Sequence, residues 1–334
     1  MADFASHRIR PRLRIRGSQH MSRVLVTGAS GFIGRQCLPI LAAKGYDVHA
    51  LSRRQLATPL PGLSWHNLDL LSQGAPSEII HQVQPDFLLH LAWYAAPSKF
   101  WEARENIDWV RASLELLLAF AANHGKRVIV AGTCAEYALN PGECLEEETP
   151  LLPATLYGTC KHSFGRILDS FSRRNDLSAA WGRIFFLYGP YEHPSRLIAY
   201  VVQSLLRAEP ALCSDGTQVL DFMHVEDAAA AFVALLENKI QGPVNIASGR
   251  PVVVRDLLQE IGMQIGRPEL IRLGARQSSS EVSRIWANVE RLTKGTGWKP
   301  HYDLASGIQQ TIEWWRNSAG LREYDPTREA NQYS

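Results

Sequence analysis

Tyr157 and Lys161 are the residues of this chain best placed for acid–base chemistry. They stand four positions apart in a segment, 157–174, whose pattern predicts a helix, so both side chains share one face. A nearby ammonium lowers the pKa of a phenol from about 10, and we expect Lys161 to tune Tyr157 for proton transfer near neutral pH. Thr133 follows a predicted strand, 127–131, where its hydroxyl either forms a turn or hydrogen-bonds a substrate oxygen beside Tyr157.

A glycine-rich turn joins the first predicted strand, 23–27, to a predicted helix, 32–44. Gly28 permits the tight turn, Gly31 lets the backbone approach a pyrophosphate, and Gly34 lets helix and strand pack closely. The helix N-terminus faces the negative charge. This context predicts a dinucleotide-binding turn. The residues expected to hold the cofactor here are Gly28, Ser30, Gly31, Phe32, Ile33 and Gly34.

The end of the second predicted strand, 48–51, carries arginines instead of an acid. NAD sites usually place a carboxylate here for the ribose 2′-hydroxyl, whereas Arg53 and Arg54 offer planar guanidinium groups that suit a 2′-phosphate. We therefore predict NADP as the cofactor. NAD is the alternative, with both arginines as solvated surface charges. Asp69 ends the third strand and either contacts the adenine or is an ordinary strand-end acid.

Strands alternate with helices up to residue 188, which predicts an α/β fold with a parallel, doubly wound sheet. The expected strands are 23–27, 48–51, 63–68, 87–91, 127–131 and 179–187, and the expected helices are 32–44, 77–83, 105–124 and 157–174. Beyond Gly189-Pro190 the rhythm changes to helices at 194–208, 225–237, 257–266 and 306–317, with strands at 218–222 and 243–246. We predict a dinucleotide-binding domain over 21–188, its sheet completed by segments within 218–248, and a smaller mixed substrate-binding domain over 189–330.

The composition excludes several classes of protein. The chain has 334 residues, 46% hydrophobic and 20% charged, which is typical of a folded protein with a core. No stretch reaches the ~18 uncharged apolar residues of a membrane span. Five cysteines without metal-ligand spacing predict no metal site and fit a reduced, cytoplasmic setting. Residues 1–20 hold five arginines and are expected to be a disordered tail; the rest is nearly neutral, so no nucleic-acid partner is expected.

Together these motifs resemble the extended short-chain dehydrogenase/reductase family, in its nucleotide-sugar epimerase, dehydratase and reductase branch. The resemblance covers 23–316. It rests on motifs in the family's order, namely Thr27-Gly-x-x-Gly-Phe-Ile-Gly34, His90-Leu91-Ala92, Gly132-Thr133, Tyr157-x-x-x-Lys161, Tyr188-Gly189-Pro190, Asp221-Phe222, Val225-x-Asp227 and Gly297-Trp298-x-Pro300. It implies a Rossmann-type sheet, a nucleotide-sugar substrate, and a homodimer formed through two long helices, here 106–124 and 157–174.

The resemblance also implies roles for single residues. Tyr157 is the expected general acid/base, Lys161 the ligand of the nicotinamide-ribose hydroxyls, and Thr133 the third catalytic residue. The other implied cofactor contacts are Asp69, Leu70, Leu91 and Ala92. The C-terminal domain is expected to bind the nucleotide-sugar.

Departures from the family pattern bear on the reaction. Dehydratases of this branch carry Asp-Glu after the catalytic Thr, where this chain has Cys134 and Ala135. Glu136 would point the other way in an extended stretch, so 4,6-dehydration is not expected. At two positions whose side chains often bind the nucleotide-sugar in this branch, the chain has Phe186 and Leu220. The resemblance therefore places Phe186 in the substrate site. Arg276 and Arg284 are the candidates to hold the diphosphate of the substrate instead. The alternative is that both are solvated surface arginines.

Aromatic residues gather where the branch varies with its substrate. Trp93 and Tyr94 follow His90-Leu91-Ala92 and are expected to face the substrate, and Phe100 and Trp101 lie in the next loop. They suit an apolar pocket for a 6-deoxy sugar, or are ordinary packing.

We predict an NADPH-dependent reductase of an NDP-4-keto-6-deoxyhexose, with Tyr157 as the general acid. Two alternatives stay open: an NDP-sugar epimerase with tightly held NAD, and a non-catalytic dinucleotide-sensing protein. The branch often has Asn at the position of Trp109, and Asn106, one turn earlier, is its candidate substitute.

Overall fold

The main sheet is parallel and has seven strands, as the alternating pattern predicts. The computed structural model describes residues 21–54, 60–277 and 282–317, so the basic segment 1–20 lies outside it. The strand order is β3-β2-β1-β4-β5-β7-β11. The strands are β1 (Arg23–Thr27), β2 (Asp47–Ser52), β3 (Leu63–Asn67), β4 (Phe87–His90), β5 (Arg127–Thr133), β7 (Ser178–Ile184) and β11 (Gly242–Ile246). The order reverses between β1 and β4, where sheets of this type bind ligands.

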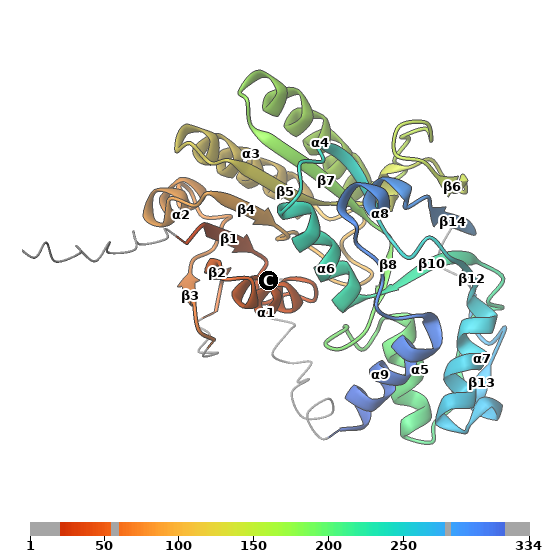
Figure 1. Ribbon diagram of the computed structural model, residues 1–334. Helices are drawn as coiled ribbons and strands as arrows, with labels where there is room; N and C mark the ends of the chain where they lie inside the picture. Colours follow the sequence, from red (N-terminus) through yellow and green to blue (C-terminus); the bar gives the residue numbers. More distant parts are fainter. Residues whose placement is uncertain (1–20, 55–59, 278–281, 318–334) are drawn as a thin grey trace, which may run out of the picture.

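Helices cover both faces of this sheet (Figure 1). On one face, α1 (Gly34–Ala43) packs against α6 (Val225–Leu236) over a core of Val, Leu and Ala side chains. On the other face lie α2 (Ala75–Val83), α3 (Glu105–Ala122) and α4 (Leu156–Arg174). Because both faces are covered, the central strands read as continuous apolar runs rather than alternating ones.

The rest of the described chain forms around a smaller sheet. Its hydrophobic core is the third, after the two cores on the faces of the main sheet. Its strands are β12 (Pro251–Val253), β10 (Val219–His224), β14 (Arg284–Ala287), β6 (Gly142–Cys144) and, paired with β10, β8 (Phe186–Tyr188). A two-stranded pair consists of β9 (Ala211–Leu212) and β13 (Ile271–Arg272). The helices are α5 (Leu197–Leu206), α7 (Val254–Ile265), α8 (Glu290–Thr296) and α9 (Leu304–Arg316), with 3₁₀ turns η1 (Cys134–Glu136) and η2 (Pro268–Leu270).

The single strand expected over 179–187 is wrong. The chain leaves the main sheet at Ile184, and β8 pairs with β10 of the second sheet. Phe185 lies between them, buried in the third core, and this change of core separates the two strands. The expected strand at 218–222 is β10, which also belongs to the second sheet. Within 218–248, β11 alone joins the main sheet.

The carboxylates of two family motifs hold backbone segments from distant parts of the chain in place. The buried Asp221 carboxylate accepts hydrogen bonds from the backbone N–H groups of Ser248, Gly249 and Ala287 at 2.9–3.2 Å. Asp227 accepts from the N–H groups of the 301–302 turn, at 2.7 and 3.0 Å. Both carboxylates accept hydrogen bonds from backbone N–H groups, which is a structural role.

Candidate active site

The glycine turn leaves a bare backbone at the N-terminus of α1. Gly28 has φ 66°, and a Cβ there would lie 2.8 Å from the Ala92 nitrogen. A Cβ on Gly34 would lie 2.1 Å from the Gly28 carbonyl oxygen, so neither position admits a side chain. The helix begins at Gly34 rather than at residue 32, and no side chain caps its first turn. A helix N-terminus carries partial positive charge that suits a diphosphate, so the turn fits the dinucleotide that the sequence predicts.

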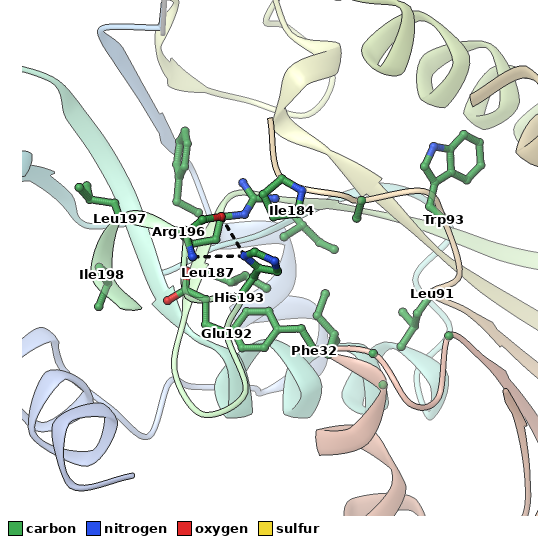
Figure 2. A pocket seen from close by; sticks show the side chains of 18 of the residues that line it. Phe32, Leu91, Trp93, Ile184, Leu187, Glu192, His193, Arg196, Leu197 and Ile198 are labelled. Carbon is green, nitrogen blue, oxygen red and sulfur yellow. Dashed lines mark hydrogen bonds between the residues drawn. The ribbon is translucent and has the colours of Figure 1, made fainter. Parts of the chain in front are cut away.

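A cavity of about 1120 Å³ extends from this turn to the second sheet. Figure 2 shows Phe32 and Leu91 toward one end, Leu197 and Ile198 toward the other, and Glu192 and His193 between them. This volume exceeds that of a typical single-ligand pocket, so two ligands can meet in it. Of the cofactor residues predicted from sequence, the wall contains Gly28, Ser30, Gly31, Phe32, Ile33, Gly34, Arg53, Arg54, Asp69, Leu70, Leu91 and Ala92.

Two arginines lie in the part of the cavity next to the glycine turn, where the cofactor is expected to bind. Arg53 and Arg54 are exposed and line the cavity directly after β2. Among the described wall residues, the only carboxylates are those of Asp69 and Glu192. Asp69 accepts a hydrogen bond from the Leu71 N–H at 3.1 Å, which fixes the turn after β3. The charge at the end of β2 is therefore positive.

Thr133, Tyr157 and Lys161 come together from β5 and α4. Thr133 is the last residue of β5, not a residue beyond it, and it is hydrogen-bonded to Tyr157. Lys161 is buried, and its Nζ donates to the Ala131 carbonyl at 2.8 Å. None of the three is part of the cavity wall, but Trp93 is, and its ring lies 3.8 Å from Lys161 Nζ.

The expected lowering of the Tyr157 pKa by Lys161 is wrong for this arrangement. Burial raises the pKa of Tyr157, the hydrogen bond with Thr133 offsets this in part, and Lys161 is not among the main causes of the shift. Burial also lowers the pKa of Lys161 to about 7, and Glu136 opposes that change. The phenol is therefore protonated at neutral pH, the state in which it can act as an acid.

The buried Glu136 carboxylate is part of a network of hydrogen bonds and an ion pair. Residues 134–136 form the turn η1 rather than an extended stretch. The Glu136 carboxylate accepts from the Thr133 N–H at 2.8 Å and the Trp181 indole at 2.8 Å, and it pairs with the Arg183 guanidinium at 3.1 Å. It therefore braces β5 against β7. With Cys134 and Ala135 beside it, the site has no spare acid–base pair here.

His90 anchors the backbone that follows β4. Its Nδ1 lies 2.7 Å from the Thr27 hydroxyl and its Nε2 lies 2.8 Å from the Ser113 hydroxyl. Burial, together with Lys161, lowers the pKa of His90 to about 3, so the ring is neutral. Thr27 also accepts from the Ala92 N–H at 3.3 Å. This network holds the Leu91–Ala92 backbone against the glycine turn.

The residues predicted for the substrate are only partly brought together. Trp93, Phe186 and Arg276 line the cavity, and the Arg276 guanidinium lies 5.1 Å from the Tyr200 ring centre. Tyr94 does not line it, because its side chain is buried in the core beneath α3. Arg284 is exposed outside the cavity, over the Trp286 ring.

Phe100 and Trp101 pack against the acid–base residue. Their ring centres lie 4.8 and 5.9 Å from that of Tyr157 in edge-to-face contacts. The Tyr157 N–H donates to the Trp101 carbonyl at 2.9 Å. Phe100 and Trp101 therefore fix the first turn of α4, and neither is part of the described cavity wall.

Sequence reasoning missed two wall residues in the loop after Tyr188-Gly189-Pro190. The Arg196 guanidinium lies 5.5 Å from the centre of the Phe100 ring and lowers the pKa of Tyr157, so it stands near the acid–base pair. Glu192 is buried, and burial raises its pKa to about 8. Their position beside a family motif was the available signal.

The described residues contain neither a membrane-spanning helix nor a metal-binding cluster. Among them, no helix is both long and apolar enough to cross a bilayer. Nor do the described His, Cys, Asp and Glu residues gather in threes where a metal ion could be held.

The chain belongs to the NAD-dependent epimerase/dehydratase family, whose model matches residues 24–247. A CDP-abequose synthase of Salmonella typhimurium is 26% identical over 306 residues, 87% of this chain and 97% of that protein. MoeE5, solved in complex with UDP-glucuronic acid and NAD, is 30% identical with a TM-score of 0.76, covering 88% of this chain and 99% of that one. UDP-N-acetylglucosamine 4-epimerase from Methanobrevibacter ruminantium, in complex with UDP-N-acetylmuramic acid, is 25% identical with a TM-score of 0.80, covering 88% and 98%.

These matches confirm the family resemblance and the doubly wound fold. The protein is an enzyme of the nucleotide-sugar epimerase/dehydratase type. Structures of its relatives hold NAD and nucleotide-sugars.

Proposed function

We propose that this enzyme uses NADPH to reduce the 4-keto group of a nucleotide-activated 6-deoxyhexose. The observation that carries the proposal is the end of β2, where Arg53 and Arg54 line the cavity in place of an acid. A guanidinium pairs with the 2′-phosphate that distinguishes NADPH from NADH. The protonated Tyr157 phenol supports the same direction of reaction, since reduction needs a proton donor at the start.

The residues of this chain divide the work of such a reduction. The nicotinamide cofactor, when bound, supplies the hydride. The glycine turn would hold the diphosphate, Lys161 the nicotinamide ribose, and Arg53 the 2′-phosphate. Tyr157 would donate its phenolic proton to the ketone oxygen, with Thr133 holding that oxygen in line. Trp93 and Phe186 would exclude water from the reacting carbon.

The far half of the cavity would hold the nucleotide-sugar. Its wall is largely apolar, with Phe186, Leu220 and Phe222 among its side chains, which suits a sugar that lacks the 6-hydroxyl. Arg196 and Arg276 are the cations of that half and would neutralise the diphosphate. We propose that residues 189–330, as far as they are described, supply most of this half.

An NDP-sugar 4-epimerase with bound NAD is the second candidate. The relatives that are named 4-epimerases, and the NAD in MoeE5, favour it. Such an enzyme oxidises and then reduces the same carbon, so Tyr157 must act first as a base. Its raised pKa opposes that first step. A dinucleotide sensor is a third, weaker candidate, because Thr133, Tyr157 and Lys161 are all present.

The identity and exchange of the cofactor separate these candidates. We expect the purified protein to bind NADPH reversibly, to prefer it over NADH, and to oxidise it when given an NDP-4-keto-6-deoxyhexose. Arg53→Glu should weaken NADPH binding by roughly 10- to 100-fold and leave NADH affinity within a few-fold, because it places a carboxylate against the 2′-phosphate. Isothermal titration gives both constants.

Arg174→Glu, an exposed arginine at the end of α4, is the matched charge control and should change neither constant. Co-purified NAD that does not exchange, with interconversion of two sugar epimers, would instead establish the epimerase.

We also propose a homodimer through α3 and α4, which pack side by side (Figure 1). Ile107 and Leu118 on α3 and Ile167 on α4 are exposed apolar side chains, 55%, 57% and 42% accessible. Such a surface on paired helices suits a partner with the same surface. Leu118→Glu should convert the dimer to a monomer in sedimentation equilibrium, whereas Met263→Glu, on the exposed face of α7, should not. A wild-type monomer would contradict the proposal.

A further inference from the structure

The Lys161 ammonium has an unusual environment. Its side chain is 3% accessible, and its one hydrogen bond among the described residues goes to the neutral Ala131 carbonyl. The groups linked electrostatically to it are Glu136, already paired with Arg183, and His90, which is neutral. Tyr157, one turn earlier on α4, is protonated. A buried cation without a carboxylate partner is costly unless another group stabilises its charge.

The Trp93 ring is that group. Its centre lies 3.8 Å from Lys161 Nζ, within the range of a cation–π contact, which is strongest when both partners are desolvated. The contact requires the face of the ring to be turned toward the amine. Trp109 stacks on Trp93 with ring centres 6.3 Å apart and planes 27° apart, which restricts its tilt.

Asn106 fixes the rotation of the same indole. Its Oδ1 accepts from Trp93 Nε1 at 2.9 Å, and its Nδ2 donates to the Phe100 and Ala103 carbonyls at 2.7 and 2.8 Å. The amide is completely buried. Because Nδ2 has two carbonyl acceptors, the amide cannot flip without losing all three contacts. It therefore presents an acceptor to the indole in one orientation.

We propose that Asn106 and Trp93 form a positioning pair that holds the Lys161 ammonium beside Tyr157, with the amide fixing the indole and the indole face stabilising the charge. The pair rests on the proposed function only in that Lys161 works with Tyr157. The same amide holds the Phe100 carbonyl, and the Phe100 ring packs edge-on against Tyr157. Asn106 thereby links the surroundings of both residues.

The protonation of Lys161 can be measured directly in the cofactor-free protein. The chain has seven lysines, so NMR of the isotope-labelled lysine side chains is tractable, and Lys161→Arg identifies the signal. Trp93→Leu removes the ring face and should lower the pKa of Lys161 by about one unit. Trp93→Phe keeps a ring but loses the indole N–H, and should recover at least half of that shift.

A double-mutant cycle tests the part of Asn106. Asn106→Ala should lower the Lys161 pKa in the wild-type background and much less in the Trp93→Phe background, which has no N–H to bind. Asn106→Ala removes the hydrogen bonds to the Phe100 and Ala103 carbonyls in both backgrounds. The effect of losing them on the Lys161 pKa therefore cancels in the cycle. Trp101→Leu removes an indole from the same loop that faces Tyr157 instead, and should leave the Lys161 pKa unchanged.

These measurements test the Asn106–Trp93 pair without depending on which reaction the enzyme catalyses. An unchanged Lys161 pKa in a folded Trp93→Leu protein, checked by circular dichroism, overturns the role of Trp93. Equal effects of Asn106→Ala in both backgrounds overturn the relay through the indole. The measurement needs no cofactor or substrate, so these results stand whether the enzyme proves to be a reductase or an epimerase.

Discussion

Replacing Tyr157 with phenylalanine is expected to lower turnover by about a hundredfold or more while cofactor binding stays within a few-fold of wild type. The substitution removes the phenolic hydroxyl, which is the proposed proton donor, and keeps the ring that packs against Phe100 at 4.8 Å. Because the fold loses only the hydrogen bond with Thr133, the variant should remain folded. Steady-state kinetics and NADPH titration of the same preparation measure the two effects.

A matched control removes a phenolic hydroxyl elsewhere. Tyr46, directly before β2, packs edge-on against Phe87, the first residue of β4, and does not line the cavity. Tyr46→Phe should therefore keep wild-type turnover. If Tyr157→Phe also keeps wild-type turnover, Tyr157 is not the acid. A wild-type protein that binds the cofactor but turns over no nucleotide-sugar would instead favour the dinucleotide-sensing role.

Lys161→Met should inactivate the enzyme and yet make it more stable. The amine is buried and its pKa falls from 10.5 to about 7. At pH 6 the folded protein must hold a charge in a dry environment, whereas the unfolded chain holds it in water. Replacing the amine with a thioether of similar length removes that cost, and we expect a gain of roughly 2–4 kcal/mol in the free energy of unfolding.

The sign of the pH dependence makes this prediction specific. Between about pH 7 and 10.5 the unfolded chain binds a proton at this lysine and the folded protein does not, so the stability of the wild type rises with pH. The advantage of Lys161→Met is therefore largest below pH 7 and fades toward pH 10. Denaturant unfolding at pH 6, 8 and 10 follows it.

Lys294 supplies the control for this effect. It is an exposed lysine on α8, paired with Glu290 one turn away, and Lys294→Met should change stability by less than about 0.5 kcal/mol at any of these pH values. A Lys161→Met protein less stable than wild type at pH 6 would show that the contacts with Ala131 and Trp93 outweigh the cost of burying the charge.

The sequence alone was sufficient for the glycine turn and its helix. Gly28 is required by its positive φ of 66°, and Gly34 by a backbone contact of 2.1 Å with the Gly28 carbonyl oxygen, within a turn and a helix that follow one another in the chain. Such short-range geometry leaves a direct mark on residue types. The same holds for the parallel sheet, because the alternation of strands and helices is a local pattern.

The tertiary structure decided the state and surroundings of the acid–base residues. The spacing of Tyr157 and Lys161 on α4 predicts a direct electrostatic effect of one on the other, but burial controls both pKa values, and burial is a property of the assembled core. Lys161 meets the ring of Trp93, 68 positions earlier, and the indole N–H of that ring donates to Asn106. Likewise the strand expected over 179–187 divides at Phe185, because two separate cores receive its halves. Periodicity records which residues avoid water, but not which core receives them or which side chains from distant segments they meet there.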